Sequence, residues 1–282
     1  MTNVLILGAG YVGTELFCYS AKERINYYLK SRKDLDYTNN LELRKFILNN
    51  DISYVVNCSG FTGRPNVDEG ELKKKDCWYL NVLLPLKISK ICKDIGIGYI
   101  HISSGCIYSG YEKEFTERDE PNFGLYDHSS FYSKTKHAFE TLNDYGCTIR
   151  VRMPFSADLH ERSYITKILK YDNLVNYKNS KTYIPDLCEF IEHIIEKNIS
   201  TSSIGIINFV NPEALDAKDV TDMMKAYNLE NKNWKFVDIK DINIIAPRSN
   251  CVLSIDKLNM LFPDFELQSE ESAIMQALSN IN

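Results

Sequence analysis

A glycine-rich turn near the N-terminus, Gly8 to Gly13, constrains the fold of this chain more than any other feature. A short apolar run precedes it and a helical pattern follows it. In such a G-x-G-x-x-G sequence, Gly8 and Gly10 allow a tight turn and close approach of the backbone to a diphosphate, and Gly13 lets the helix pack closely on the strand. Free N–H groups at the start of the helix favour an anion. We therefore predict a dinucleotide site that includes Tyr11 and Val12, in preference to a purely structural turn.

Strands and helices alternate through the first half of the chain. Apolar runs predict strands at residues 4–7, 27–29, 54–57, 99–102 and 147–151, and helical patterns lie between them at residues 11–24, 41–48, 78–95 and 129–145. Strands that alternate with helices of this length indicate an α/β fold. We expect a doubly wound parallel sheet with right-handed crossovers.

This rhythm changes after Pro154. We expect one further strand at residues 204–209 and helices at residues 163–171, 186–198, 216–227, 256–261 and 270–278, with Pro185 just before one helix and Asp216 as the cap of another. No linker rich in Gly, Ser or Pro divides the chain. Residues 1–154 are predicted to form a dinucleotide-binding domain, and residues 155–282 mainly a small α/β substrate lobe that is partly interleaved with the sheet.

Composition narrows the class of protein. The chain has 282 residues, of which 44% are hydrophobic and 25% charged, as in an ordinary soluble globular protein. The net charge of −5, without a basic stripe, argues against a nucleic-acid partner, and no run approaches the ~20 apolar residues of a membrane span. The eight cysteines form no C-x-x-C pair and the histidines show no ligand spacing, so we expect no metal. We predict a reduced, cytoplasmic protein without a membrane partner.

Tyr132 and Lys136 are the strongest candidates for catalysis. They lie four residues apart and therefore share one face of a helix. An ammonium beside a phenol favours the phenolate, so we expect Lys136 to lower the pKa of Tyr132 from its ordinary value of about 10. Ser104, at the end of the preceding strand, offers a hydroxyl to the same reacting oxygen. Such a set moves a proton on and off a carbonyl or alcohol oxygen while a hydride goes to or from its carbon.

The end of the second predicted strand bears on the choice of cofactor. Enzymes that use NAD usually place an acidic residue there, whereas this chain reads Ser31-Arg32-Lys33. Arg32 can grip a 2′-phosphate with two hydrogen bonds, which favours NADP(H). The alternative is that Arg32 and Lys33 form a solvated turn. Asp36 is either a contact to the adenine ring or a turn residue.

Other cofactor contacts are expected where later strands end. The small residues Cys58, Ser59 and Gly60 follow the third strand and would let a cofactor lie against the backbone. Lys136 would hydrogen-bond the nicotinamide ribose, and Met153 is placed in the same site. Asn81 lies within a predicted helix, although Asn is a mediocre helix former. It either supports the catalytic lysine or is a surface residue.

Several polar residues have both a functional and a structural interpretation. Cys106 follows a strand end, on the side where α/β sheets bind ligands, but a buried cysteine is often a small hydrophobe. Lys167 alone resembles a solvated helix lysine. Arg64 and Arg248 lie in loops with proline and either clamp a diphosphate or a sugar hydroxyl, or are surface residues. The predicted substrate contacts are Arg64, Asn66, Asn81, Ser104, Cys106 and Arg248.

Seven segments give the chain a resemblance to a known family. They read GFTGRPNVD (60–68), GCI (105–107), PNF (121–123), FYSKTK (131–136), RVRMP (150–154), ITK (165–167) and APRSN (246–250). In these segments the chain resembles an extended short-chain dehydrogenase/reductase with a Rossmann fold. More narrowly, it resembles the nucleotide-sugar 3,5-epimerase/4-reductases of UDP-L-rhamnose synthesis, which also form the C-terminal half of plant rhamnose synthases.

This resemblance implies UDP-4-keto-6-deoxy-glucose as substrate. The C4 ketone acidifies the hydrogens at C3 and C5, and family precedent gives Cys106 and Lys167 the acid/base role that inverts both centres through an enolate. NADPH then reduces C4, while Tyr132 protonates the oxygen with help from Ser104 and Lys136. The enolate oxygen would occupy the same Ser/Tyr pocket. The resemblance also implies a homodimer formed through the helices at residues 78–95 and 129–145.

Competing interpretations remain at this point. One is a dTDP-4-dehydrorhamnose 4-reductase without epimerase activity, against which the pair Cys106 and Lys167 argues. Another is a non-catalytic NADP-binding regulator, but such a protein typically loses the Tyr or the Lys, and Tyr132 and Lys136 are both present. The sequence leaves UDP and dTDP sugars open, because uracil and thymine differ by a single methyl group.

Overall fold

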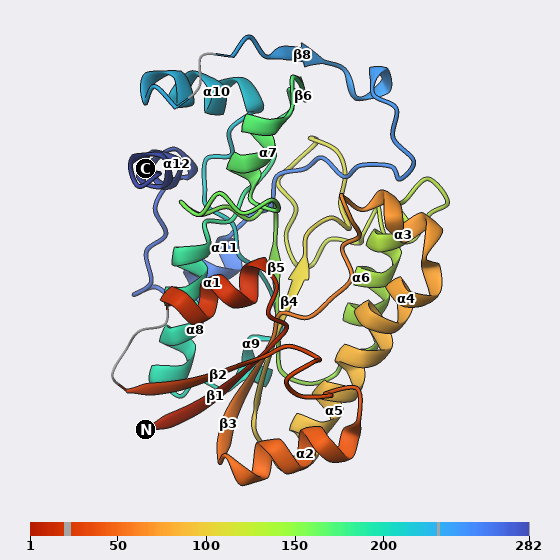
Figure 1. The fold of residues 1–282 in the computed structure, drawn as a ribbon, viewed down its shortest axis with the longest axis vertical. Coiled ribbons are helices and arrows are strands. Elements are labelled where there is room, and N and C mark those ends of the chain that lie inside the picture. The colour runs from red at the N-terminus through yellow and green to blue at the C-terminus, as the bar shows by residue number, and fades with distance from the viewer. Residues whose placement is uncertain (20–23, 230–231, 282) are drawn as a thin grey trace.

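A parallel sheet forms the centre of the molecule (Figure 1). The computed structural model describes residues 1–19, 24–229 and 232–281, and within them six strands pair in the order β2-β1-β3-β4-β5-β7. These strands are β1 (Thr2–Leu7), β2 (Ile25–Lys30), β3 (Ile52–Asn57), β4 (Gly98–Ser104), β5 (Cys147–Val151) and β7 (Ile206–Asn208). Every pairing is parallel, which confirms the predicted doubly wound sheet. The strand order reverses at β1, so a ligand crevice is expected beyond the ends of β1 and β3.

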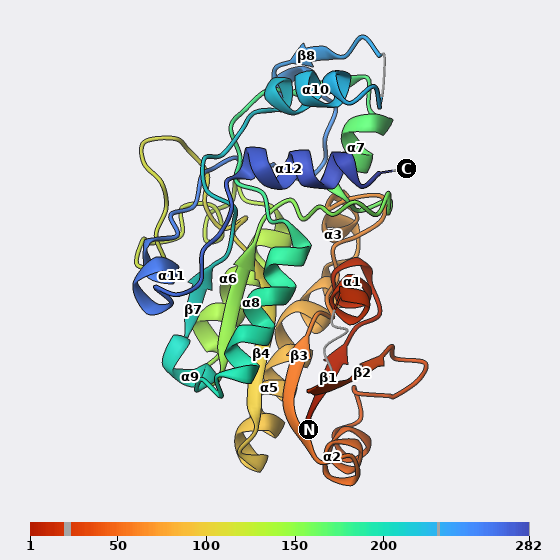
Figure 2. The same cartoon turned by 90° about the vertical axis from the view of Figure 1, so that its left-hand side faces the viewer.

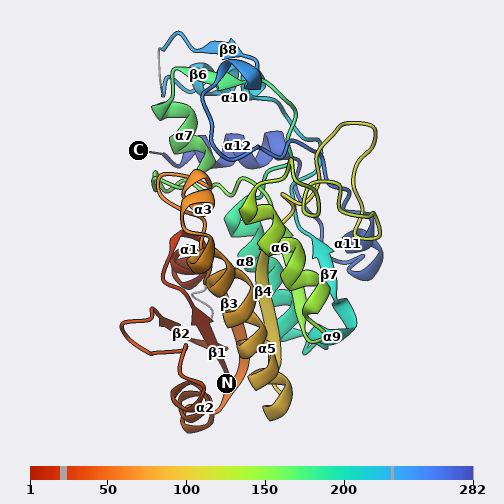
Figure 3. The ribbon, with the colours of Figure 1, turned by 90° about the vertical axis from the view of Figure 1, so that its right-hand side faces the viewer.

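Successive residues of β1 point to opposite faces of the sheet, as the strand period of two requires. Val4 and Ile6 are fully buried in a core with α1 (Tyr11–Tyr19) and α8 (Ile184–Glu196). Leu5 and Leu7 are fully buried in a second core, which is formed with α2 (Asn40–Asn49), α5 (Leu84–Ile95) and α6 (Phe131–Leu142). Figures 2 and 3 show these two helical layers in turn. A sheet covered on both faces explains why its strands are apolar almost throughout.

The long helix predicted over residues 78–95 begins earlier and contains a π-helical turn. It consists of α4 (Lys74–Trp78), the π turn η1 (Tyr79–Leu83) and α5, which follow one another without a break. Proline has no N–H, so Pro85 cannot donate to the carbonyl of Asn81 as a helical residue would. The π turn falls where that hydrogen bond is missing, and π turns often accompany functional sites.

The C-terminal half contributes to the sheet and also builds a separate core. The helices α8, α9 (Thr201–Ile204) and α11 (Asp256–Leu261), with strand β7, lie at the sheet. By contrast, α7 (Tyr164–Lys170), α10 (Ala217–Ala226) and α12 (Glu270–Ser279) surround another apolar cluster, at the top of Figure 1. There β6 (Asn173–Val175) pairs in parallel with β8 (Lys235–Val237). The proposed boundary at residue 154 stays a prediction.

Several element boundaries differ from the predictions for local reasons. The helix expected over residues 129–145 is α6, because Ser130 caps its start through the N–H of Ser133 and Asn143 leaves helical geometry. α8 begins at Ile184, with Pro185 inside its first turn, where a missing N–H costs nothing. The predicted cap Asp216 is confirmed. The helix expected over residues 11–24 is described as far as the end of α1; residues 20–23 lie outside the described residues, and Arg24 is in a turn.

Short elements were not predicted. They are α3 (Asp68–Leu72), α9, β6, β8 and the 3₁₀ turn η2 (Ile239–Asp241). None of the helices described here is long and apolar enough to cross a membrane. Within the same described ranges, no group of three His, Cys, Asp or Glu side chains is arranged to hold a metal ion.

A buried ion pair ties the C-terminal elements together. The Lys181 ammonium lies 2.6 Å from the Glu270 carboxylate at the start of α12, and both side chains are almost completely buried. Lys181 also donates to the carbonyl of Leu215 (2.8 Å), and the backbone N–H of Leu215 donates back to Glu270 (3.0 Å). Residues from three separate parts of the chain therefore meet at one charged contact.

Candidate active site

The glycine-rich turn has the geometry that a dinucleotide site needs. Gly8 adopts a φ of +101°, and a Cβ there would lie 2.7 Å from the backbone nitrogen of Ser59. A Cβ on Gly13 would lie 2.1 Å from the carbonyl oxygen of Gly8. Gly10, by contrast, has open space beside it. Gly8 and Gly13 therefore let β1, β3 and α1 pack closely, while Gly10 leaves room for a ligand to approach the backbone.

The side chain of Tyr11 is used elsewhere. Its hydroxyl lies 2.9 Å from that of Ser156, and its ring stacks on His160 with a centroid distance of 4.7 Å. Burial raises the pKa of Tyr11. Val12 packs partly buried against the core beside it. Any contact that Tyr11 makes to a cofactor is therefore expected to come from its backbone at the start of α1.

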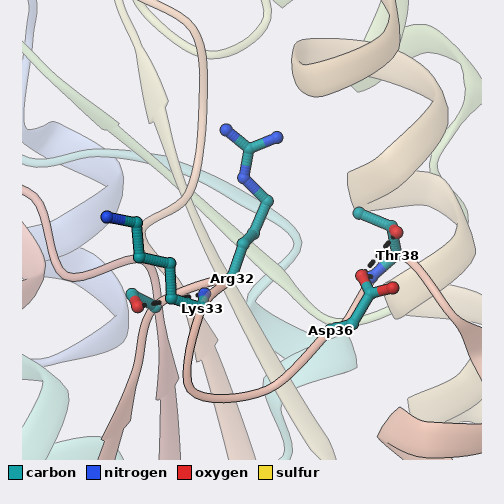
Figure 4. Close-up of a pocket in the computed structure, with 5 residues that line it drawn as sticks. Arg32, Lys33, Asp36 and Thr38 are labelled. Atoms are coloured by element: carbon teal, nitrogen blue, oxygen red, sulfur yellow. Dashed lines mark hydrogen bonds between the residues drawn. The ribbon is translucent and has the colours of Figure 1, made fainter.

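An open hollow lies beside the turn after β2 (Figure 4), lined by Ser31, Arg32, Lys33, Asp36 and Thr38. The carboxylate of Asp36 accepts hydrogen bonds from the Thr38 N–H (3.1 Å) and hydroxyl (2.6 Å). These bonds lower the pKa of Asp36. Asp36 is thus a turn residue that also forms part of the wall, and its contact to adenine stays a prediction. The side chains of Arg32 and Lys33 extend upward from the turn in Figure 4, as a phosphate clamp requires.

The loop after β3 places small residues beside the predicted catalytic lysine. The hydroxyl of Ser59 donates to the Asn57 side chain at 2.5 Å, which fixes the start of this loop. A Cβ on Gly60 would lie 3.9 Å from Nζ of Lys136. Burial raises the pKa of Cys58 to about 12, so this cysteine stays a neutral thiol. The predicted cofactor contacts of this loop therefore lie next to Lys136.

Asn81 is fully buried, so the surface interpretation of this residue is wrong. It lies in the π turn, accepts a hydrogen bond from the Phe61 N–H (2.7 Å) and donates to the Phe61 carbonyl (2.9 Å). It also donates to the Thr135 hydroxyl at 3.1 Å. The amide of Asn81 thus joins the β3 loop to the helix that carries the predicted catalytic pair. Its direct contact with a substrate stays a prediction.

Tyr132 and Lys136 lie one turn apart on α6, and Tyr132 is hydrogen-bonded to Ser104 at the end of β4. Nζ of Lys136 lies 5.7 Å from the centroid of the Tyr132 ring. Burial raises the pKa of Tyr132, the nearby Cys106 adds to this, and the hydrogen bond with Ser104 lowers the pKa by less. The expectation of a lowered pKa for Tyr132 is therefore wrong, because desolvation of the phenolate outweighs the groups that lower this pKa, which are Ser104 and Arg162. Burial also lowers the pKa of Lys136. A protonated phenol suits the donation of a proton to an oxygen that gains negative charge.

Cys106 lies immediately beside this pair. Its backbone N–H donates to the Ser104 hydroxyl at 3.3 Å, and a charge on Cys106 acts on both Tyr132 and Lys136. The thiol is half-buried and forms no disulfide. Cys106 is therefore part of the candidate site by position, and is not one of the fully buried cysteines of the core.

Lys167 lies on α7 and is half-buried. Burial lowers its pKa, and the positive charges of Arg162 and Arg248 lower it further, against the opposing effect of Glu161. An ammonium in such surroundings loses its proton more readily than a solvated one. The environment of Lys167 thus departs from that of an ordinary surface lysine.

The two predicted arginines of the loops differ. Arg248 donates to the Asp68 carboxylate at 2.8 Å, and the Ala246 N–H donates to the same oxygen at 2.9 Å. Burial raises the pKa of Asp68, but these hydrogen bonds outweigh it, so the net shift is downward. Arg64 is exposed, and the Asn66 side chain accepts from the Asp68 N–H at 2.9 Å. The substrate contacts of Arg64, Asn66 and Arg248 stay predictions.

Other residues of the site were not predicted from the sequence. Glu140 lies one helical turn beyond Lys136, accepts from the Ser103 hydroxyl (2.9 Å) and pairs with Arg150 (2.8 Å) in a buried contact. Glu140 follows Lys136 by four residues, so the sequence already indicates that both lie on one face of the helix. Arg162, near Lys167, had no sequence signal. Met153 has a φ of +35° just after β5, and its cofactor contact stays a prediction.

These features define a class of protein. A glycine-rich turn with open space at Gly10 and a Ser–Tyr–Lys set lie at the carboxyl edge of one parallel sheet, as in a dinucleotide-binding oxidoreductase of the short-chain type. The family profile of the RmlD substrate binding domain matches residues 1–282. The chain therefore belongs to this family.

Individual relatives agree with this membership. A bifunctional dTDP-4-dehydrorhamnose 3,5-epimerase/dTDP-4-dehydrorhamnose reductase of Arabidopsis thaliana is 37% identical over 235 residues, which cover 79% of this chain and 75% of that protein. The trifunctional enzyme RHM1 of the same plant, a UDP-glucose 4,6-dehydratase/UDP-4-keto-6-deoxy-D-glucose 3,5-epimerase/UDP-4-keto-L-rhamnose-reductase, is 35% identical over 238 residues. The match covers 80% of this chain and 34% of RHM1, so the chain corresponds to about a third of that protein.

Solved structures share the fold. The L780 UDP-rhamnose synthase of Acanthamoeba polyphaga mimivirus superposes with a TM-score of 0.86 at 24% identity, over 99% of both chains. A dTDP-4-dehydrorhamnose reductase of Bacillus anthracis, solved in complex with NADP, gives 0.85 at 17% identity and the same coverage. At these identities the superpositions establish the fold.

Proposed function

We propose that this protein converts UDP-4-keto-6-deoxy-D-glucose to UDP-L-rhamnose, by epimerisation at C3 and C5 followed by reduction of the C4 ketone. The reduction step, which makes this an enzyme of the NADPH-dependent 4-keto-sugar reductase type, is supported by the family and by the relatives of the chain. The observation that supports the epimerisation step is the position of Cys106 directly beside Ser104 and Tyr132. A reductase alone has no need of a thiol at that point.

The reduction follows from the state of Tyr132. Bound NADPH supplies the hydride, and the open face of Gly10 and the cations Arg32 and Lys33 suit such a dinucleotide. The raised pKa of Tyr132 keeps the phenol protonated at neutral pH, so that it can donate to the C4 oxygen as the ketone becomes an alcohol. Ser104 hydrogen-bonds the phenol, and the positive charge of Lys136 stabilises the phenolate that remains.

The epimerisation needs an acid and a base that reach opposite faces of the sugar ring. One group removes a proton next to the C4 ketone, and the other returns a proton to the opposite face of the resulting enolate. Cys106 comes from the end of β4 and Lys167 from α7, so the two groups reach a substrate from different elements. The lowered pKa of Lys167 increases the fraction of neutral amine that can accept a proton. The Ser104 and Tyr132 hydroxyls would stabilise the enolate oxygen.

Substitution of the proposed acid and base tests this assignment. In Cys106→Ala and Lys167→Ala, we expect deuterium incorporation at C3 and C5 to fall by about 10²–10⁴-fold, as for the loss of a general acid or base. Purified protein would be incubated with UDP-4-keto-6-deoxy-glucose and NADPH in D₂O, and the product analysed by NMR. The matched controls Cys18→Ala, an exposed cysteine, and Lys170→Ala, an exposed lysine of the same helix α7, should retain exchange.

The same experiment on the unaltered protein tests the overall reaction. A 6-deoxy-L-manno product with deuterium at C3 and C5 would establish epimerisation and reduction in one chain. Oxidation of NADPH that gives a D-configured sugar without deuterium would contradict the epimerase and leave a 4-reductase. Intact exchange in both Cys106→Ala and Lys167→Ala would refute the residue assignment, whatever the product.

The cofactor assignment of Arg32 can be tested separately. Hydrogen bonds to charged groups contribute about 1.5–3 kcal/mol, so Arg32→Ala is expected to raise the KM for NADPH at least about tenfold. The KM for NADH should change little, because NADH lacks the 2′-phosphate. Arg44→Ala, at a partly exposed arginine paired with Asp94, is the control. Equal effects on NADPH and NADH would show that Arg32 does not recognise the 2′-phosphate.

A further inference from the structure

Arg162 connects two parts of the chain that flank the candidate site. Its guanidinium donates to the hydroxyl of Thr62 and, at 2.8 Å, to the carbonyl of Gly63. Thr62 and Arg162 are 100 residues apart. The loop between β3 and α3 is thereby fixed to the segment that leads into α7, the helix of Lys167. A fork that donates to two acceptors holds a guanidinium in a defined position.

The backbone around Arg162 is fixed as well. Its N–H donates to Nδ1 of His160 at 3.1 Å, and the ring of His160 stacks on Tyr11 at the glycine-rich turn. The neighbouring Ser156 bonds the Tyr11 hydroxyl. The segment that carries Arg162 is therefore anchored at the predicted cofactor site on one side and at the β3–α3 loop on the other.

The positive charge of Arg162 acts on the proposed catalytic groups Lys167 and Tyr132. It lowers the pKa of Lys167, second in effect after burial, and it also lowers the pKa of Tyr132. The other charged groups that act on Lys167 are Arg248, which also lowers its pKa, and Glu161, which raises it. Arg248 is itself paired with Asp68, whereas the bonds of Arg162 go to a hydroxyl and a carbonyl. The charge of Arg162 is thus not neutralised by the groups that hold it.

We propose that Arg162 is a positioning residue of the epimerase, which joins the β3–α3 loop to the start of α7 and keeps a fixed positive charge beside Lys167 and Tyr132. This inference rests on the function proposed above. A neighbouring positive charge disfavours the ammonium form of Lys167, so a larger fraction of its amine is neutral at neutral pH. Arg162 itself need not touch the substrate.

The protonation of Lys167 can be measured without any catalysis. Competitive acylation with acetic anhydride over a range of pH, read by mass spectrometry, gives the midpoint of Lys167 in the whole protein. In Arg162→Gln we expect that midpoint to rise by roughly half a pH unit or more. Arg162→Lys, which keeps a charge, should lie closer to the unaltered protein. Arg44→Gln, at a partly exposed arginine paired with Asp94, should not change the Lys167 midpoint.

The pH profile of C3 and C5 deuterium exchange gives the second readout. The part of this profile that follows deprotonation of Lys167 should move to higher pH in Arg162→Gln, by the same amount as the acylation midpoint. A merely structural role of Arg162 would not produce such a matched shift. An unchanged midpoint in folded Arg162→Gln overturns the inference. If that variant does not fold, Arg162→Met takes its place, because it also removes the charge and keeps an unbranched side chain. An unchanged midpoint in folded Arg162→Met counts equally against the inference.

The two proposals can fail separately. If the unaltered protein exchanges no deuterium at C3 and C5 but Arg162→Gln still raises the acylation midpoint, the epimerase is refuted and the electrostatic role of Arg162 stands. If exchange occurs and neither the midpoint nor the pH profile responds to Arg162→Gln, the epimerase stands and Arg162 is a structural residue.

Discussion

Replacement of Tyr132 by phenylalanine is expected to lower the rate of C4 reduction by about 10²–10⁴-fold, the usual contribution of a positioned general acid. The Tyr132 phenol is hydrogen-bonded to Ser104, and its raised pKa keeps it protonated. Phenylalanine fills the same space without the hydroxyl. The measurement is kcat for NADPH oxidation with the 4-keto sugar, together with the Kd for NADPH from its fluorescence.

The control for Tyr132→Phe is Tyr126→Phe, at an exposed tyrosine in the loop before α6. This control should leave both constants unchanged, and Tyr132→Phe should leave NADPH binding within a small factor of the unaltered protein. A Tyr132→Phe variant that still reduces the ketone at a near-normal rate would show that another group donates the proton.

The second large effect is expected on stability, at the buried pair Lys181–Glu270. Lys181→Met should lower the free energy of unfolding by about 3–5 kcal/mol, because it leaves the Glu270 carboxylate buried without its cation. Urea unfolding followed by circular dichroism gives this value. Lys218→Met, at an exposed pair with Asp222, is the matched control and should cost less than about 1 kcal/mol.

A double variant separates charge from packing. A buried ion pair replaced by apolar side chains of similar volume is often as stable as the original, so Lys181→Met with Glu270→Leu should recover much of the loss. Full recovery is not expected, since Glu270 also accepts hydrogen bonds from the N–H groups of Lys181 and Leu215. If Lys181→Met alone costs no more than Lys218→Met, the pair does not hold these segments together.

The parts of the fold that depend on local pattern could be predicted from the sequence. The apolar strands, the glycine-rich turn and the cap at Asp216 each follow from neighbouring residues, and the structure agrees with all three. The strands β6 and β8 could not be found in this way. Each has three residues, and the register pairs Asn173 with Lys235, so their existence depends on a contact between distant segments.

The chemistry of the site was less accessible for a similar reason. The spacing of Tyr132 and Lys136 indicates that they share a helix face, but it does not contain the burial that raises the pKa of Tyr132. Likewise, nothing near Arg162 in the sequence indicates that its partners are Thr62 and Gly63. Burial and long-range contacts are properties of the folded chain, and they determine whether an ionisable group is charged. The local sequence pattern shows only on which element such a group lies.

The strand β7 has a consequence for how this protein is made. During synthesis the N-terminal strands leave the ribosome first, yet β5 has no neighbour on its outer side until Ile206–Asn208 have been translated. Until then the main chain of β5 offers unpaired N–H and C=O groups, which can pair with another chain. The pairing of the sheet thus cannot be completed before residues 206–208 have been made. We therefore expect nascent chains to aggregate most readily when translation slows or stops between residues 151 and 206, because β5 then stays unpaired for longer.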